Sequence, residues 1–141
     1  MILVDFDTSV WIDVFRDDSG GRRKSLNAAL QGEEVVLSRF CQLELLQGCR
    51  DEPEWRLLKT YLSTQDYVEA SAGTWEHAAR IYFELRRIGL TVRSPIDCCI
   101  AQLALENDLV LFHRDRDFTT IAKAWPLRQL RIEWVEPDLS A

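Results

Sequence analysis

The sequence lacks any apolar run close to the roughly 20 residues that a helix needs to cross a bilayer. Its first residues also lack a basic segment followed by a long apolar stretch, which is the pattern of a secretion signal. No internal repeat, linker or low-complexity tract divides the 141 residues. A chain of this length buries roughly two-thirds of its unfolded surface on folding. We therefore expect a soluble, cytoplasmic protein without membrane contact, with a single domain over residues 1–141.

The residues that bind zinc are also scarce. The chain has only two His, and none of its four Cys belongs to a C-x-x-C pair. A structural zinc site takes Cys and His ligands at such spacings, so we do not expect one. Cys98 and Cys99 are neighbours, which suits a local disulfide poorly. We expect reduced and mostly buried thiols.

Positive charge is in deficit, because 23 acidic residues outnumber 17 basic ones and leave a net charge of −6. Affinity for nucleic acids is largely electrostatic, so an evenly spread negative charge would exclude a phosphate-rich partner. The exclusion does not hold if several acids gather at one metal site, because a bound cation inverts the local field. The placement of the acids along the chain therefore matters more than their number.

Short apolar runs alternate with segments of helical periodicity. The pattern predicts strands at 2–5, 35–38, 109–112 and within 130–136. Helices are predicted at 9–16, 22–31, 40–47, 53–64, 74–87, from Ser94–Pro95 onward, and at 117–124. Strands that alternate with helices indicate an α/β fold with a mostly parallel sheet covered on both faces.

Four acids stand where such a sheet gathers its ligands, beyond the carboxyl ends of the strands. They are Asp7 just past the first strand, Glu44 in the helix after the second, Asp97 in the first turn of the Ser-Pro helix, and Asp115 after the strand at 109–112. Each has an ordinary alternative role. Asp7 could cap the helix that follows it, and Asp97 could stabilise the N-terminus of its helix through the helix dipole. Glu44 could be a solvated helix residue, and Asp115 could form an ion pair in a turn.

Convergence of these acids would have a chemical consequence. Two carboxylates about 4 Å apart repel by about 4 kcal/mol at an effective dielectric near 20. A cluster of them must take up protons or bind a cation. Ligands that are all oxygen favour Mg²⁺ or Mn²⁺, which bind phosphate oxygens and activate water for attack at phosphorus. If the acids converge, metal-dependent phosphodiester hydrolysis becomes the leading chemistry.

Four segments carry a family resemblance. They read ILVDFDTSVWID at 2–13, LELLQG at 43–48, LTVRSPIDCCIAQLALENDL at 90–109 and FHRDRDFTTIA at 112–122. In that order they resemble the PIN-domain ribonucleases, and most closely the VapC toxins of type II toxin–antitoxin pairs. The resemblance implies a three-layer α/β/α sandwich around a short, mostly parallel sheet. It also implies an acidic site that holds Mg²⁺ or Mn²⁺ and cleaves RNA.

The resemblance assigns roles residue by residue. It implies that Asp7, Glu44, Asp97 and Asp115 are the catalytic, metal-holding acids. Asp117 would assist them, and Thr8 or Ser9 would steady the first acid. Nearby Arg93, Arg114 or Arg116 could hold the RNA backbone, although ion pairs with the acids are an equal alternative. The implied partners are an RNA substrate, a second copy of the chain in a homodimer, and a VapB-type antitoxin in a heterotetramer or larger assembly.

The first motif departs from the family. Its usual form runs from strand into Asp-Thr-Ser, whereas this chain reads VDFDTS, which leaves Asp5 and Asp7 as rival first ligands. Asp7 is favoured because Thr8 follows it directly, and Asp5 would be auxiliary. The same residues resemble the first motif of haloacid dehalogenase-type phosphatases, with Asp5 as nucleophile. That alternative needs a late Lys before an acidic pair, and Lys123 follows Asp115 instead. A non-catalytic PIN-like binding module is the third possibility, and it would lack one of the matching acids.

Overall fold

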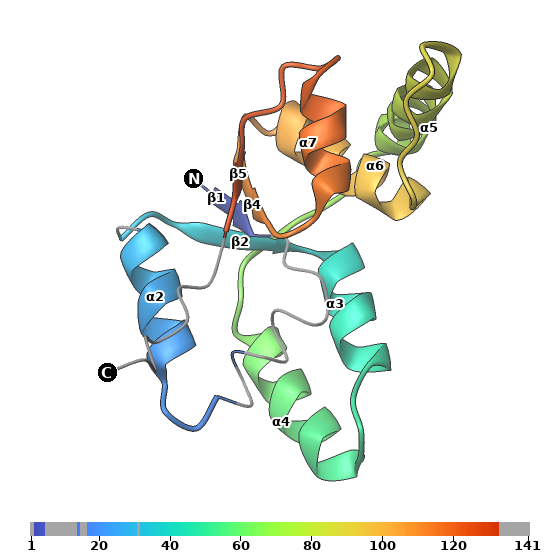
Figure 1. Ribbon diagram of the computed structural model, residues 1–141. Coiled ribbons are helices and arrows are strands. Elements are labelled where there is room, and N and C mark those ends of the chain that lie inside the picture. Colours follow the sequence, from blue (N-terminus) through green and yellow to red (C-terminus); the bar gives the residue numbers. More distant parts are fainter. Residues whose placement is uncertain (1, 5–13, 15–16, 31, 133–141) are drawn as a thin grey trace.

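The computed structural model describes residues 2–4, 14, 17–30 and 32–132. Its sheet contains β1 (Ile2–Val4), β2 (Val35–Ser38), β3 (Tyr67–Val68), β4 (Val110–His113) and β5 (Gln129–Arg131). These strands lie in the order β3-β2-β1-β4-β5, and every neighbouring pair is parallel (Figure 1). All their carboxyl ends therefore meet at one edge of the sheet.

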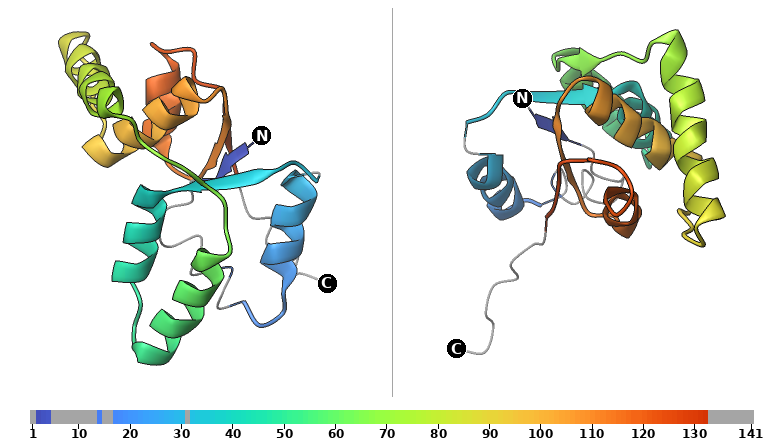
Figure 2. Two further views of the ribbon diagram at one scale, coloured as in Figure 1. Left: turned by 180° about the vertical axis from the view of Figure 1, so that it is seen from behind. Right: turned by 90° about the horizontal axis from the view of Figure 1, so that it is seen from above.

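The helices cover both faces of this sheet. They are α2 (Gly21–Leu30), α3 (Arg39–Gln47), α4 (Glu52–Ser63), α5 (Ala72–Arg87), α6 (Pro95–Glu106) and α7 (Arg116–Ala122). Helices α2, α3 and α4 lie on one side, and α5, α6 and α7 lie on the other, in the views from front and behind (Figures 1 and 2). The predicted three-layer α/β/α sandwich is confirmed.

Alternation along the strands divides the core between the two faces. Leu3 and Leu111 point to the side of α5–α7, where they pack with buried residues of α6 such as Ile100. Their neighbours Ile2 and Phe112 pack on the opposite side, against α2–α4. Both faces of β1 and β4 are thus buried, which is why these strands read in the sequence as unbroken apolar runs.

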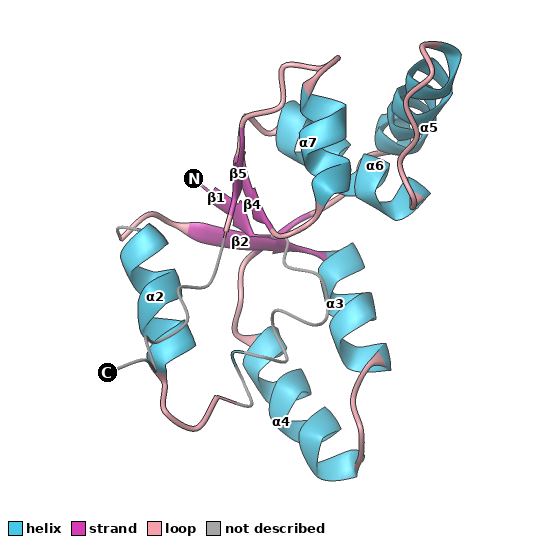
Figure 3. Ribbon diagram, viewed as in Figure 1, coloured by secondary structure: helices cyan, strands magenta, loops and turns pink. Residues whose placement is uncertain are grey.

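Several helices begin directly at the carboxyl edge of the sheet. Helix α3 starts at the residue after β2 ends (Figure 3). Ser38 ends that strand and caps the helix, because its Oγ accepts a hydrogen bond from the Cys41 N–H at 3.1 Å. Ser94 caps α6 in the same way by accepting from the Ile96 N–H at 3.1 Å, with Pro95 in the first turn. The predicted start of this helix is confirmed.

Two strands differ from the prediction. The two-residue strand β3 was not predicted, because Tyr67–Val68 is too short to show an alternating pattern. Strand β5 spans Gln129–Arg131, earlier than the predicted 130–136, whose last residues lie outside the described part of the chain. The predicted helix at 9–16 also falls almost entirely outside the described residues.

The thiols behave as expected. None of the four cysteines, all of which the structure describes, forms a disulfide, and Cys41, Cys98 and Cys99 are buried. Burial, with a smaller contribution from the adjacent Asp97 charge, raises the pKa of Cys98 to about 12. This thiol therefore stays protonated at neutral pH. Within the described residues, none of the helices combines the length and apolarity that crossing a bilayer requires.

Removing the cap of α3 should lower stability measurably. Ser38 is fully buried, so Ser38→Ala would leave the Cys41 N–H without an acceptor. We expect a loss of about 1–2 kcal/mol in the free energy of unfolding, measured by urea denaturation. The control is Ser63→Ala, which removes an exposed hydroxyl donated to the Thr60 carbonyl and should change stability by less than about 0.5 kcal/mol. Equal effects for the two variants would contradict a structural role for this cap.

Candidate metal centre

Three carboxylates meet where α6 and α7 begin. Asp97 lies in the first turn of α6, Asp115 is the N-cap of α7, and Asp117 lies in the first turn of α7. One oxygen from each carboxylate lies within 4.8 Å of the other two. Asp117 is almost fully buried, and Asp97 and Asp115 are half-buried. We call these three residues the acidic cluster.

The turn after β4 fixes the orientation of Asp115. Its Oδ1 accepts the backbone N–H of Asp117 at 2.9 Å, which caps α7. Its own N–H donates to Nδ1 of His113 at 3.1 Å. The local turn therefore orients this carboxylate without the help of a ligand.

His113 supports this turn from the core. The side chain is fully buried, and its ring packs against Phe118 with the ring centroids 4.9 Å apart. Because Nδ1 accepts the Asp115 N–H, the proton lies on Nε2, which donates to Oε1 of Gln129 at 2.6 Å. Burial lowers the pKa of His113 and favours this neutral form. The sequence reasoning used His113 only to argue against zinc. The supporting role of His113 could have been predicted from its position, because it ends a buried strand two residues before a candidate ligand.

Arg93 binds the acidic cluster from the loop before α6. Its backbone N–H donates to Oδ2 of Asp117 at 2.9 Å, and its Nη2 donates to Oδ1 of Asp115 at 2.9 Å. Its Nε lies 3.8 Å from Oδ1 of Asp117. The hydrogen bond to Asp115, followed by the charges of Asp115 and Asp117, raises the pKa of Arg93. Asp117 therefore links the loop before α6 to the first turn of α7.

The predicted site residues divide into three groups. Asp97, Asp115 and Asp117 are brought together. Glu44 lies half-buried on α3, which also starts at the carboxyl edge of the sheet, but it is not a member of the acidic cluster. The remaining candidates at the first motif, Asp5, Asp7, Thr8 and Ser9, lie outside the described residues.

The predicted basic residues surround the same turn. Arg93 forms the ion pair that was one of its two predicted roles. Arg114 lies in the turn between β4 and α7, and Arg116 is the first residue of α7. Arg114 is half-buried and Arg116 is exposed.

The donor set of the acidic cluster suits a hard divalent cation. Its ligand atoms are all carboxylate oxygens, the preferred donors of Mg²⁺ and Mn²⁺. Three like charges at this separation repel, so a cation placed among them relieves a cost that the fold imposes. Mg²⁺ usually keeps several waters, so one or two direct carboxylates with the others acting through water would suffice.

Comparison with known proteins shows the family. Residues 5–124 match the PIN domain family. The chain is 34% identical over 132 residues to the VapC ribonuclease Mb1587 of Mycobacterium bovis, in an alignment that covers 87% of this chain and 92% of that relative. The ribonuclease VapC11 of Mycobacterium tuberculosis matches with the same identity and coverage.

Solved structures share the fold. The crystal structure of VapBC2 from Rickettsia felis bound to a DNA fragment from its promoter superposes with a TM-score of 0.73 and 18% identity, covering 94% of this chain and all of the matched chain. DNA-bound VapBC from Salmonella typhimurium gives a TM-score of 0.70 at 20% identity, covering 93% and 98% of the two chains.

The acidic cluster leads to a binding prediction that does not depend on RNA. Mn²⁺ should raise the melting temperature of the protein, because an ion that binds only the folded state adds about 2.7 kcal/mol when it is present at 100 times its Kd. Asp97→Asn should reduce this shift strongly, because it removes one ligand charge. The measurement is a thermal unfolding curve with and without Mn²⁺.

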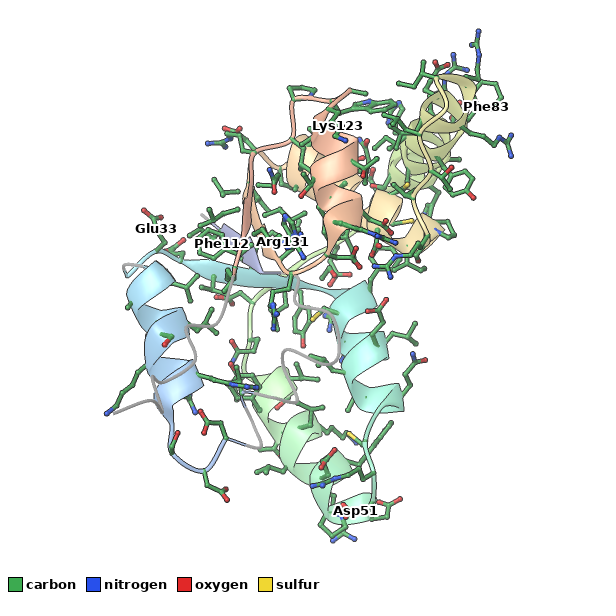
Figure 4. The ribbon with its side chains drawn as sticks, viewed as in Figure 1. Glu33, Asp51, Phe83, Phe112, Lys123 and Arg131 are labelled. Atoms are coloured by element: carbon green, nitrogen blue, oxygen red, sulfur yellow. The ribbon has the colours of Figure 1, made fainter. Side chains whose placement is uncertain are left out.

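A matched control is available at the far end of the molecule. Asp51 caps α4 by accepting the Glu54 N–H at 2.9 Å, and it lies far from the start of α6 and α7 (Figure 4). Asparagine caps helices equally well, so Asp51→Asn should keep the full Mn²⁺ shift. A wild-type protein that Mn²⁺ leaves unchanged, or an Asp97→Asn variant with the full shift, would rule out the acidic cluster as a metal centre.

Proposed function

The chain belongs to the VapC ribonuclease family of PIN-domain proteins, and on this basis we propose that it is the toxin of a type II toxin–antitoxin pair. Its activity in this proposal is that of an endoribonuclease that depends on Mg²⁺ or Mn²⁺. The observation that carries the proposal is the convergence of Asp97, Asp115 and Asp117. Membership of this family leaves the haloacid dehalogenase alternative, with Asp5 as nucleophile, without support.

The acidic cluster supplies part of the ligand set. Asp97 and Asp115 would hold the cation, with Asp117 assisting. Asp7 and Glu44 would complete the set, with Thr8 or Ser9 steadying Asp7 and Asp5 nearby. A divalent cation bound there lowers the pKa of a coordinated water and neutralises charge on the scissile phosphate.

Neighbouring side chains and backbone groups orient the carboxylates of this site. Ser94 fixes the first turn of α6 and therefore the position of Asp97. His113 and the Asp117 amide orient Asp115 before the substrate arrives, so little reorganisation remains for the reaction itself. Arg93, Arg114 and Arg116 would supply positive charge for the RNA backbone, which a chain with a net charge of −6 otherwise lacks.

The proposal includes partners and a place in the cell. The related structures include VapBC assemblies, which supports a VapB-type antitoxin as the partner of this chain, with two toxin copies in the assembly. Cysteines without disulfides suit a reducing compartment, so we place the protein in the cytoplasm as one PIN domain.

Loss of one ligand should strongly slow cleavage. Asp97→Asn should lower the rate of RNA cleavage about 10²-fold or more, because even groups that merely orient metal ligands are worth about 10–100-fold. The assay follows fragmentation of total bacterial RNA with added Mn²⁺, and EDTA should stop the wild-type reaction reversibly. Asp51→Asn again serves as the control and should cleave at the wild-type rate.

The same assay tests the alternatives. Full activity of Asp97→Asn would remove this residue from the mechanism. Hydrolysis of p-nitrophenyl phosphate with RNA left intact would favour a phosphatase instead. Asp7→Asn should impair cleavage more than Asp5→Asn, and the reverse order would make Asp5 the first ligand.

A cellular experiment addresses the toxin role. Expression of the chain alone should arrest bacterial growth, and co-expression of the neighbouring upstream gene should relieve the arrest. Expression of Asp97→Asn should leave growth unaffected, since the arrest requires cleavage. Unimpeded growth of cells that contain the folded wild-type protein would contradict the assignment as a toxin.

A further inference from the structure

Arg93 is tied to the acidic cluster in two separate ways. Its backbone N–H is bound to Asp117, while its guanidinium is hydrogen-bonded to Asp115 and lies 3.8 Å from Oδ1 of Asp117. Its side chain is nevertheless 62% exposed, whereas the side chains of Asp115 and Asp117 are 17% and 3% exposed. The backbone of Arg93 is therefore anchored in the buried part of the site, and its charged end lies at the solvent side.

The guanidinium occupies one of the two oxygens of the Asp115 carboxylate. Oδ1 of Asp115 already accepts the Asp117 N–H and Nη2 of Arg93, both at 2.9 Å. A carboxylate oxygen with two hydrogen bonds has little lone-pair capacity left for a cation. A divalent ion at the acidic cluster would also repel the guanidinium, because both carry positive charge and use the same carboxylates.

We propose that Arg93 is the counterion of the acidic cluster and that its guanidinium exchanges Asp115 for a phosphate of the RNA when the site is loaded. This inference rests on the proposed function. The hydrogen bond from the Arg93 backbone to Asp117 does not involve the side chain, so the guanidinium can leave Asp115 while its point of attachment stays in place. The freed group remains at the solvent side of the metal centre.

The chemistry of the side chain fits its second partner. The planar fork of arginine binds phosphate through two parallel hydrogen bonds, as it binds a carboxylate. The phosphate would take over the charge compensation that Asp115 gives up. An arginine in this role both shields the acids before loading and holds the substrate afterwards.

The proposal predicts opposite effects on two affinities. Arg93→Gln should bind Mn²⁺ more tightly, by about tenfold in Kd measured calorimetrically without RNA, because a competing charge is gone. The same variant should show a KM for RNA raised by about tenfold at saturating Mn²⁺, because a charged contact to phosphate is lost. A residue with a merely structural role would weaken both affinities together.

Two further variants complete the design. Arg93→Lys keeps the charge without the fork, so its Mn²⁺ affinity should stay near the wild-type value while its KM rises. The control is Arg128→Gln, because Arg128 is 56% exposed and binds Asp108 at 2.7 Å outside the acidic cluster. This control should change neither quantity. Should Arg93→Gln fail to fold, the KM of Arg93→Lys still tests the phosphate contact, and an unchanged KM in that variant overturns the inference.

The outcomes separate the inference from the function on which it rests. A wild-type protein that neither binds Mn²⁺ nor cleaves RNA overturns the proposed function. A wild-type protein that does both, together with an Arg93→Gln variant that has unchanged or lowered Mn²⁺ affinity, overturns the inference alone. An unchanged KM in both Arg93 variants would equally exclude the phosphate contact.

Discussion

The repulsion among the carboxylates of Asp97, Asp115 and Asp117 is the constraint around which the site is organised. Ligand oxygens within 4.8 Å of one another would separate in a flexible chain. The fold holds them in place partly through two hydrogen bonds, from the Asp115 N–H to the His113 ring and from the Arg93 N–H to Asp117. Arg93 offsets part of the negative charge, and a divalent cation would offset more. The contacts that stabilise this part of the fold therefore also position the carboxylates proposed to bind the cation.

The parallel sheet explains why the acids meet where they do. Parallel strands present all their carboxyl ends at one edge, and the helices that follow them start there. His113 ends β4, and Asp115 follows two residues later as the cap of α7. Ser38 ends β2 in the same way and begins the helix that carries Glu44. A single topological feature thus brings together segments that are far apart in the sequence.

Local sequence signals were sufficient to predict the helices and strands whose ends are marked by nearby residues. Ser94–Pro95 marked the start of α6, and the apolar runs at β2 and β4 were long enough to be recognised. They were insufficient for β3, whose two residues become a strand only by pairing with Leu37 and Ser38 of β2. Sequence pattern also leaves open which apolar residues of α5 are buried, since Trp75 is 55% exposed whereas Ile81 on the same helix is buried.

The order of amino acids by itself determined the alternation of strands and helices, the family, and the candidacy of the three acids that the structure brings together, because each depends on neighbours a few residues apart. Only the tertiary structure decided that Asp117 is buried as a brace for the Arg93 loop, that His113 is a neutral support, and that Arg93 binds the acidic cluster. These roles depend on contacts between residues 16 to 24 positions apart, whose geometry follows from packing and not from local pattern. The burial of these side chains and the distances between their charges are set only when the parallel strands bring their carboxyl ends to one edge of the sheet.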